Sequence, residues 1–320
     1  MRPTIGISAG DPAGIGLEVT LKAVPDFLSL ASCVLFTDRL HFDRDFQLVA
    51  QKHLPFRWIS QISEVSDEPA LFLIDVPGAH GLVPRSELSL HAGKRALAYL
   101  EAVSDAANRK RIQAIVTAPV SKASIGGEFK GQTEFLAERA GVSQFAMAFF
   151  APTFKVVLVT VHMSLKQSIE QLSTERYIRL ISFVDKQLSR FGQRNSRIAV
   201  AAINPHAGEG GMFGTEDDQI LRPAVEHCVS QGIAVSGPHS ADSLYYRAHS
   251  GEFDVVIAPY HDQGLIPVKL IAHGESTNVT LGLPYIRTSP DHGTAFAIAG
   301  MNQADPTGMS SAIRCALDLL

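Results

Sequence analysis

The sequence has few of the features that mark secreted, membrane or nucleic-acid-binding proteins. Its three cysteines, Cys33, Cys228 and Cys315, lie far apart, which argues against a disulfide framework and favours a reducing compartment. Lysine and arginine number 28 against 32 acidic residues, and the net charge of −4 provides no broad cationic surface for nucleic acid or an anionic membrane. No apolar run approaches the length of a membrane span, and the chain does not open on a signal peptide. We expect a cytoplasmic protein that binds neither nucleic acid nor membrane.

The sequence does contain the composition of a well-packed globular protein. Its 320 residues are 46% hydrophobic and 19% charged, with 25 glycines and 17 prolines spread along the chain. This length exceeds what one hydrophobic core usually fills, so we expect two lobes. Because no Pro/Gly/Ser linker divides the chain, the two lobes are expected to interleave in sequence.

Short apolar runs rich in β-branched residues alternate with segments of helical periodicity. This alternation predicts an α/β fold with a mainly parallel sheet. The predicted strands are Thr4–Ser8, Ser32–Phe36, Leu71–Asp75, Ile112–Thr117, Val156–Val161, Arg197–Ile203 and Val255–Ala258. The predicted helices are Leu17–Val24, Gly93–Arg109, Thr174–Arg190 and Thr215–Ser230.

Three histidines, His162, His206 and His261, come directly after predicted strands. Ligands of such sheets collect at the carboxyl ends of strands. Three imidazoles around a divalent cation leave positions open for substrate, as in a catalytic metal site. Imidazole favours zinc, while magnesium, cobalt and manganese stay open. The alternative is three ordinary loop histidines, as we expect for His41, His53, His80 and His91.

Two aspartates lie near these histidines in sequence. Asp262 follows His261, and Asp242 precedes a helical segment. Either carboxylate would orient a ligating imidazole or handle protons during catalysis. For Asp242, helix capping is an equal alternative.

Two polar loops are candidates for holding a dinucleotide. Gly10, Gly14 and Gly16 follow the first strand, but their spacing matches neither the dinucleotide fingerprint nor a P-loop. The second loop places an acid, an imidazole, a glycine and a hydroxyl together. Its residues are Asp291, His292, Gly293 and Thr294. By itself this loop is either a nucleotide clasp or an ordinary polar turn.

A third set of residues has the chemistry to bind an anionic substrate. Lys269, Asn278 and Arg287 lie nine residues apart in apolar surroundings, and they either converge on a phosphate or carboxylate or are solvated surface groups. Gln132 and Thr133 begin a helical segment, where they either bind a substrate anion or, for Thr133, cap the helix.

Taken together, these segments resemble the 4-hydroxythreonine-4-phosphate dehydrogenase family of vitamin B6 biosynthesis, nearly end to end. The matching motifs are GDPAGIGLEV, TAPVSKASI, GQTEFLAERAG, VTVHMSL, INPHAGEGGMFGTED, GPHSADSLYY, YHDQGLIPVKL and STNVTLGLPYIRTSPDHGTAFAIAG. INPHAGEGG and YHDQG are the most specific of them. GDPAGIGLEV and DHGTAFAIAG are also similar, more distantly, to segments of isopropylmalate and isocitrate dehydrogenases.

The resemblance implies an isopropylmalate dehydrogenase-like, two-lobed α/β/α fold with mostly parallel sheets and an active-site cleft between the lobes. Residues 1–130 plus 275–320 would form the cofactor-side lobe, and residues 131–274 the metal and dimerisation lobe. The implied metal ligands are the three strand-end histidines, supported by Asp242 and Asp262. The implied substrate ligands are Gln132, Thr133, Lys269, Asn278 and Arg287.

The implied reaction is a metal-dependent oxidation of 4-phosphohydroxy-L-threonine by NAD or NADP, followed by decarboxylation, in a homodimer whose subunits share each active site. One residue departs from the family pattern: Gln132 replaces the histidine of GHTEFLA, and glutamine cannot become a cation. The alternatives are therefore a related dehydrogenase of threonate or erythronate 4-phosphate or of a cis-dihydrodiol dicarboxylate, and, from another class, a non-catalytic anion-binding protein.

Overall fold

We analysed a computed structural model that describes residues 2–49, 53–78, 81–272 and 274–320. The chain forms two compact units. Unit 1 comprises Met1–Phe145 and Leu283–Leu320, and unit 2 comprises Ala146–Gly282. Both boundaries fall later in the chain than the predicted 130/131 and 274/275. The first differs because helix α5 (Gln132–Arg139) packs with unit 1, where it contacts helix α3 (Leu90–Asn108).

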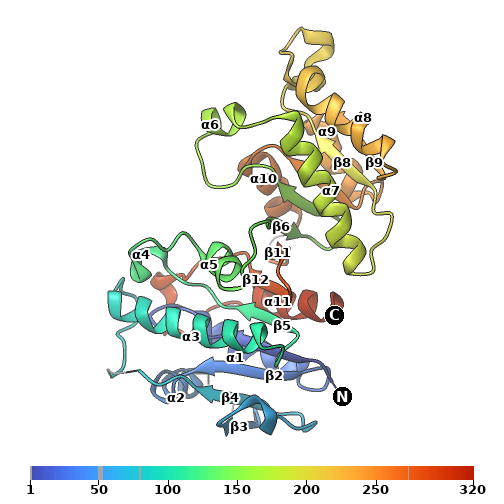
Figure 1. Ribbon diagram of the computed structural model, residues 1–320. Coiled ribbons are helices and arrows are strands. Elements are labelled where there is room, and N and C mark those ends of the chain that lie inside the picture. The colour runs from blue at the N-terminus through green and yellow to red at the C-terminus, as the bar shows by residue number, and fades with distance from the viewer. Residues whose placement is uncertain (1, 50–52, 79–80, 273) are drawn as a thin grey trace. The chain divides into compact units, whose positions relative to one another are not determined.

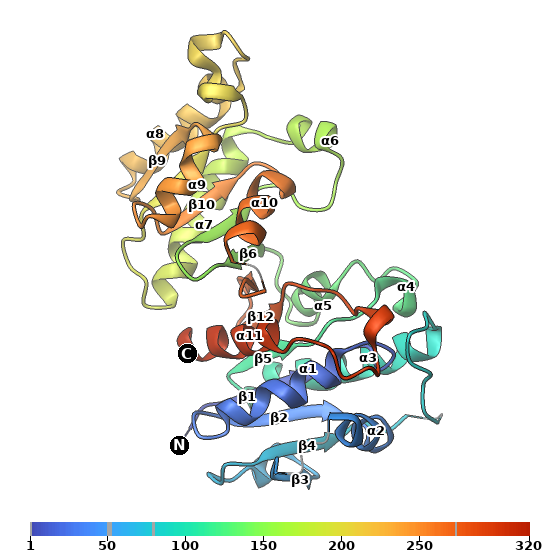
Figure 2. The same ribbon diagram turned by 180° about the vertical axis from the view of Figure 1, so that it is seen from behind.

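Unit 1 is a wholly parallel sheet covered by helices (Figures 1 and 2). Its strand order is β3-β4-β2-β1-β5-β12. The strands are β1 (Thr4–Ser8), β2 (Ser32–Thr37), β3 (Phe56–Ile59), β4 (Leu71–Asp75), β5 (Ala114–Thr117) and β12 (Ile286–Pro290). The other helical elements are α1 (Gly16–Ala23), η1 (Val24–Phe27), α2 (Arg39–Val49), η2 (Ile62–Glu64), α4 (Lys122–Ile125), η5 (Phe296–Ile298) and α11 (Thr307–Asp318). Helix α3 lies on one face of the sheet, while α1 and α11 lie on the other.

Unit 2 has a mixed sheet in the order β11-β6-β7-β10-β8-β9. The strands are β6 (Ala146–Phe150), β7 (Lys155–Leu158), β8 (Ile198–Ala201), β9 (Val235–His239), β10 (Val255–Ala258) and β11 (Thr277–Leu281). The helical elements are α6 (Leu165–Glu170), α7 (Thr174–Arg190), η3 (Pro205–Gly211), η4 (Asp217–Leu221), α8 (Arg222–Ser230), α9 (Ala241–His249) and α10 (His261–Ile271). Strands β7, β10, β8 and β9 run parallel, and β6 is antiparallel to both β7 and β11. Helices α9 and α10 pack their buried apolar residues on the sheet.

The predicted elements form largely where expected, and the predicted α/β architecture with mostly parallel strands is confirmed. The predicted helix Thr215–Ser230 forms, but its first part, Asp217–Leu221, is π-helical and only α8 is a regular α-helix. Pro223, the second residue after this turn, has no backbone N–H and so cannot donate the hydrogen bond that a regular α-helical turn would need there. All three cysteines are free, as predicted. Within the described ranges, no helix combines the length and apolarity that crossing a bilayer requires.

One expected surface histidine is instead buried beside β2. His41, 1% exposed, contacts both carboxylate oxygens of Asp38 through Nδ1 at 2.8 and 2.9 Å, and its Nε2 accepts a hydrogen bond from the Val83 N–H. Asp38 also accepts hydrogen bonds from the buried Arg95 and Tyr99. Burial by itself would raise the pKa of Asp38, but the hydrogen bonds with His41 and Tyr99 hold it well below its ordinary value. The prediction for His41 failed because Val83, Arg95 and Tyr99, which bond to the His41–Asp38 pair, come from distant segments. His80 lies outside the described residues.

Candidate functional site

The three predicted metal histidines follow three neighbouring parallel strands of unit 2. Strand β10 pairs with β7 on one side and with β8 on the other, and all three run in the same direction. His162 follows β7, His206 follows β8, and His261 opens helix α10 directly after β10. Parallel strands end at one edge of the sheet, so the local sequence places all three at the edge where such folds bind ligands.

His162 and His261 lie together at that edge. Their ring centroids are 6.0 Å apart. The His261 Nδ1 is 2.7 Å from Asp262 Oδ1. A carboxylate at this distance accepts the Nδ1 proton, which leaves the lone pair of Nε2 available to a metal. The predicted supporting position of Asp262 beside an imidazole is therefore found in the structure.

His206 does not join this pair in a single cluster. It lies in a segment whose backbone is left-handed from His206 (φ 52°) to Gly210 (φ 65°). The start of this segment is fixed by Asn204, whose backbone and side-chain amides donate to Asp217 Oδ2, both at 3.0 Å. The exposed His206 ring lies 6.1 Å from the ring of Phe213. Three ligands on one ion thus stays a prediction from the sequence.

The imidazole pair suits a divalent cation in its chemistry. Zn²⁺, Co²⁺ and Mn²⁺ accept imidazole nitrogen, and a catalytic site keeps positions open for other ligands. In the parts of the chain that the structure describes, no three His, Cys, Asp or Glu side chains gather around one point. The described residues therefore fit as two neighbouring ligands of an open site, with His261 oriented by Asp262.

Asp242 is in the first turn of α9 and is exposed. Its Oδ1 accepts a 2.8 Å hydrogen bond from the Ser240 hydroxyl. This bond lowers the pKa of Asp242, with smaller contributions from the Ser243 amide and from His206. Asp242 does not provide the helix cap, because Ser240 occupies that position. The structure thus associates Asp242 with His206 and associates Asp262 with His261.

The predicted anion ligands fall on both units. In unit 2, Lys269 lies exposed in the last turn of α10, and Asn278 is half-buried on β11. In unit 1, Arg287 lies on β12 and Thr133 in the first turn of α5. The surface-charge alternative is wrong for Arg287, since the residue is only 3% exposed.

Arg287 connects the end of strand β5 with the start of helix α5 inside unit 1. It donates one hydrogen bond to Thr133 Oγ1 at 3.3 Å and another to Thr117 Oγ1 at 2.7 Å. Burial lowers the pKa of Arg287 from 12.5 to about 10, opposed by the nearby Glu134. The guanidinium is therefore still charged at neutral pH, in surroundings that disfavour a charge. An anion bound here would offset the free-energy penalty of burying this charge.

Gln132, the residue before Thr133, has its side-chain amide N–H bonded within the protein. Its Nε2 donates to the Ala118 carbonyl at 3.2 Å, while the buried Oε1 has no partner in the described parts of the chain. The sequence led us to expect this residue as a hydrogen-bond donor to an anion. In the structure its unused group is an acceptor, which suits a hydroxyl or ammonium of a ligand.

The two candidate dinucleotide loops touch through their backbones. The Ile15 N–H donates to the Thr294 carbonyl at 3.1 Å. A Cβ atom on Gly14 would lie 2.7 Å from that same carbonyl oxygen. Thr294 belongs to the predicted clasp with Asp291, His292 and Gly293, whose nucleotide-binding role stays a prediction. Gly14 is therefore required for the close approach of segments that are 280 residues apart.

We expect Gly14→Ala to push the Thr294 loop away from the glycine loop. Overpacking of this kind lowers the free energy of unfolding by about 1–3 kcal/mol, and dinucleotide affinity is expected to fall about tenfold. Calorimetric titration with NAD and thermal unfolding measure both effects. Gly81→Ala is the matched control, because a Cβ at Gly81 meets nothing within 4 Å. Equal effects of the two substitutions would contradict the prediction.

Two residues near these loops escaped the sequence reasoning. Thr117, fully buried at the end of β5, contacts Arg287. Its position at the end of a predicted strand could have marked it as a site residue. Asp11 is also fully buried, and burial raises its pKa. Its Oδ1 accepts from the Ala13 N–H at 2.9 Å. This carboxylate shapes the glycine loop from within, which spacing alone does not reveal.

Comparison with known proteins places these features in a family. The family model described as Pyridoxal phosphate biosynthetic protein PdxA matches residues 29–316. The 4-hydroxythreonine-4-phosphate dehydrogenase of Aquifex aeolicus is 39% identical over 324 residues, covering 100% of this chain and 99% of the relative. The D-threonate 4-phosphate dehydrogenase of Salmonella typhimurium is 37% identical over 322 residues, covering 99% and 98%.

Solved structures show the same relationship. The 4-hydroxythreonine-4-phosphate dehydrogenase of Klebsiella pneumoniae superimposes with a TM-score of 0.90 at 36% identity, covering 100% of this chain and 98% of that one. A terephthalate 1,2-cis-dihydrodiol dehydrogenase from Burkholderia xenovorans has a TM-score of 0.68 at 30% identity, covering 99% and 98%. The isocitrate dehydrogenase of Methylococcus capsulatus, at 14% identity and TM-score 0.52 over 99% of this chain and 85% of that one, confirms the predicted fold. The chain therefore belongs to the PdxA family of pyridoxal phosphate biosynthetic proteins, and it is an oxidoreductase.

Proposed function

We propose that this enzyme oxidises 4-phosphohydroxy-L-threonine with NAD or NADP to 2-amino-3-oxo-4-phosphooxybutanoate, which decarboxylates to 3-amino-2-oxopropyl phosphate. The observation that carries the proposal is the imidazole pair His162–His261, with His261 held by Asp262, in a chain of this family. This pair lies at the sheet edge where the fold binds ligands. The extensive identity to named 4-hydroxythreonine-4-phosphate dehydrogenases supports the substrate.

His162 and His261 would hold a divalent cation, with His206 as the third ligand that the sequence predicts. When bound, such a cation supplies Lewis-acid chemistry: it lowers the pKa of a hydroxyl and polarises a carbonyl. Asp262 fixes the tautomer of His261. Asp262 and Asp242 are the predicted groups for taking the hydroxyl proton, and the Asp262–His261 contact supports an orienting role for Asp262 in addition.

The other residues bind and orient. Arg287, with Thr133 beside it, offers a buried cation and a hydroxyl to the substrate phosphate. Lys269 and Asn278 are the remaining predicted substrate ligands. The Thr294 loop, packed on Gly14, would hold the dinucleotide. When bound, the dinucleotide would supply the hydride acceptor for substrate C3, the base would take the hydroxyl proton, and the resulting β-keto acid would lose carbon dioxide. The proposal includes the homodimer with shared active sites, which sedimentation of the purified protein tests.

A second candidate substrate is D-threonate 4-phosphate. Relatives named for that substrate match this chain as closely as those named for 4-hydroxythreonine phosphate. The two substrates share a phosphate and differ in the group next to the carboxylate, which is an amine in one and a hydroxyl in the other. The buried Gln132 Oε1 would accept a hydrogen bond from either group.

A substrate panel tests the proposal. The protein, NAD or NADP and a divalent cation are mixed with 4-phosphohydroxy-L-threonine, D-threonate 4-phosphate, erythronate 4-phosphate and a terephthalate dihydrodiol, and NADH or NADPH absorbance is followed. We expect the highest kcat/KM on 4-phosphohydroxy-L-threonine. A preference for D-threonate 4-phosphate would establish the second candidate instead. Full activity after thorough chelation would refute metal dependence.

Within this panel, we expect Gln132→His to lower KM for the phosphorylated substrates about tenfold. The family histidine adds a donor that becomes a cation, and one hydrogen bond to a charged group is worth about 1.5–3 kcal/mol. Gln132→Leu is the matched control, because leucine fills similar space with neither donor nor charge. The idea fails if leucine and histidine change KM alike, or if the dihydrodiol gains as much as the phosphates.

A further inference from the structure

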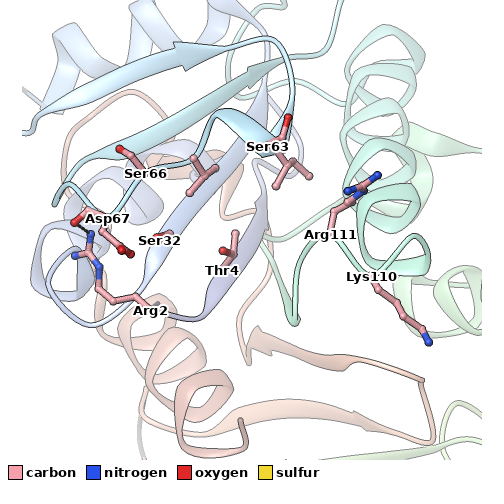
Figure 3. A pocket seen from close by; sticks show the side chains of 10 residues that line it. Arg2, Thr4, Ser32, Ser63, Ser66, Asp67, Lys110 and Arg111 are labelled. Carbon is pink, nitrogen blue, oxygen red and sulfur yellow. Dashed lines mark hydrogen bonds between the residues drawn. The ribbon is translucent and has the colours of Figure 1, made fainter.

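A polar cavity of about 370 Å³ opens at the amino-terminal end of the unit 1 sheet (Figure 3). Thr4 and Ser32, the paired first residues of β1 and β2, contribute to its lining. The segment from Ile62 to Asp67 and the residues after α3 complete the lining. Because the sheet is parallel, this cavity lies at the opposite end of the strands from the glycine loop and Thr117. It is therefore separate from the site described above.

Two hydroxyls that line the cavity form no hydrogen bond with a described residue. Ser32 is only 3% exposed, and its hydroxyl has no hydrogen-bond partner in the described ranges. The same is true of the Thr4 hydroxyl, although the backbone N–H of Thr4 donates to Gln113 Oε1 at 2.7 Å. Thr4 itself is only half-buried. Both hydroxyls line the cavity, where a ligand would meet them.

Basic residues line the cavity on two sides of these hydroxyls. In Figure 3, Ser32 and Thr4 lie between Arg2 on one side and Arg111 and Lys110 on the other. The Arg2 guanidinium is already hydrogen-bonded within the protein, since it donates to the backbone carbonyls of Leu28, Asp67 and Glu68. Arg111 and Lys110 are exposed and form no ion pair with a described residue. A single carboxylate, Asp67, opposes these three cations.

The turn after α3 fixes the two uncommitted cations in place. Lys110 has a left-handed backbone with φ 56°. Its N–H donates to the Ala107 carbonyl at 2.8 Å, and the Arg111 N–H donates to the Ala106 carbonyl at 2.9 Å. This turn fixes the points at which the Lys110 and Arg111 side chains leave the backbone.

We propose that this cavity is a second anion site that binds a phosphate group, carried by a small metabolite or present as inorganic phosphate. Arg111 provides the planar donor fork that phosphate oxygens accept, and Ser32 and Thr4 provide neutral donors at the cavity floor. The volume is within the range of small-ligand sites. The site does not depend on the proposed reaction.

Calorimetric titration with inorganic phosphate and with glycerol 3-phosphate tests this site. The full-length Arg287→Met protein serves as the background, because that substitution removes the phosphate ligand of the other site. We expect one phosphate site to persist there. Adding Arg111→Glu should raise its Kd at least tenfold, and Ser32→Ala about tenfold. Arg109→Glu is the matched control, since Arg109 is equally exposed but does not line the cavity.

Each outcome of the titration decides the proposal. Binding of both probes, tighter for glycerol 3-phosphate, supports a metabolite site, and binding of inorganic phosphate alone supports a site for the free ion. Absence of binding in the Arg287→Met background overturns the proposal, as does an equal loss from Arg109→Glu and Arg111→Glu. Turnover of the otherwise wild-type Arg111→Glu enzyme stays unchanged, so a failure of this proposal is distinguishable from a failure of the proposed function.

Discussion

His261→Ala is expected to lower kcat/KM at least about 10³-fold and to leave the fold intact. Lewis-acid stabilisation by a bound cation is worth several kcal/mol, and 1.4 kcal/mol corresponds to a factor of ten in rate. His261 is one of the two imidazoles that the structure brings together, with ring centroids 6.0 Å apart. The side chain is only half-buried at the first position of α10, where alanine is an acceptable residue.

The measurement combines steady-state kinetics with metal content and thermal unfolding. His162→Ala should have the same effect, because the two rings would share one cation. Asp262→Asn should cost about 10–100-fold, the usual effect of losing the group that orients a ligand. His227→Ala is the matched control, since His227 is an exposed histidine on α8 of the same unit. A fully active, metal-replete His261→Ala enzyme would contradict the assignment, and undiminished turnover of Asp262→Asn would remove Asp262 from the mechanism.

The sequence predicted best those parts of the fold in which burial shapes the residue pattern. Strands β1, β4 and β10 form over the predicted residues, because continuous apolar runs are what a strand covered on both faces requires. Strands β3, β6, β9, β11 and β12 were missed, and two of them, β9 and β12, lack an apolar run. Their sequences VSGPH and IRTSP carry glycine, proline or polar residues. These strands exist because neighbouring strands supply hydrogen bonds, which a local pattern does not contain.

The same distinction applies to the candidate site. The positions of His162 and His261 were predictable, since the carboxyl end of a parallel strand can be located from the end of its apolar run. The separate surroundings of His206 were not, because they arise from five consecutive left-handed residues held through Asn204 and Asp217. The burial of Arg287 was also hidden. An arginine in a short polar segment is predicted to be exposed. Its burial follows only once its partners Thr117 and Thr133 are known.

Arg287→Met is expected to lower kcat/KM for phosphorylated substrates by about 10²–10³-fold, mainly through KM. Removing one partner of a buried charge pair costs about 2–5 kcal/mol of binding free energy. The dihydrodiol substrate, which has no phosphate, should lose far less. Steady-state kinetics with both kinds of substrate measures this difference. A uniform loss on all substrates would assign Arg287 to the scaffold instead.

Thermal stability separates these two roles of Arg287 further. Burial lowers the pKa of Arg287 from 12.5 to about 10, so the folded protein binds this proton less tightly than the unfolded chain does. The charged guanidinium therefore lowers stability at every pH below about 10, and the penalty fades as the pH rises above that value. Without ligand, Arg287→Met should unfold at the same or a higher temperature than the wild type at pH 7.

The same variant should lose the stabilisation that a phosphorylated ligand gives. A ligand at a hundred times its Kd stabilises the folded state by about 2.7 kcal/mol, and an anion beside Arg287 also removes the desolvation penalty. Arg95→Met is the matched control, because Arg95 is also buried in unit 1 and forms an ion pair with Asp38. That control should unfold at a lower temperature and keep the full ligand-induced shift. If Arg287→Met behaves like Arg95→Met, Arg287 stabilises the fold and does not bind the substrate.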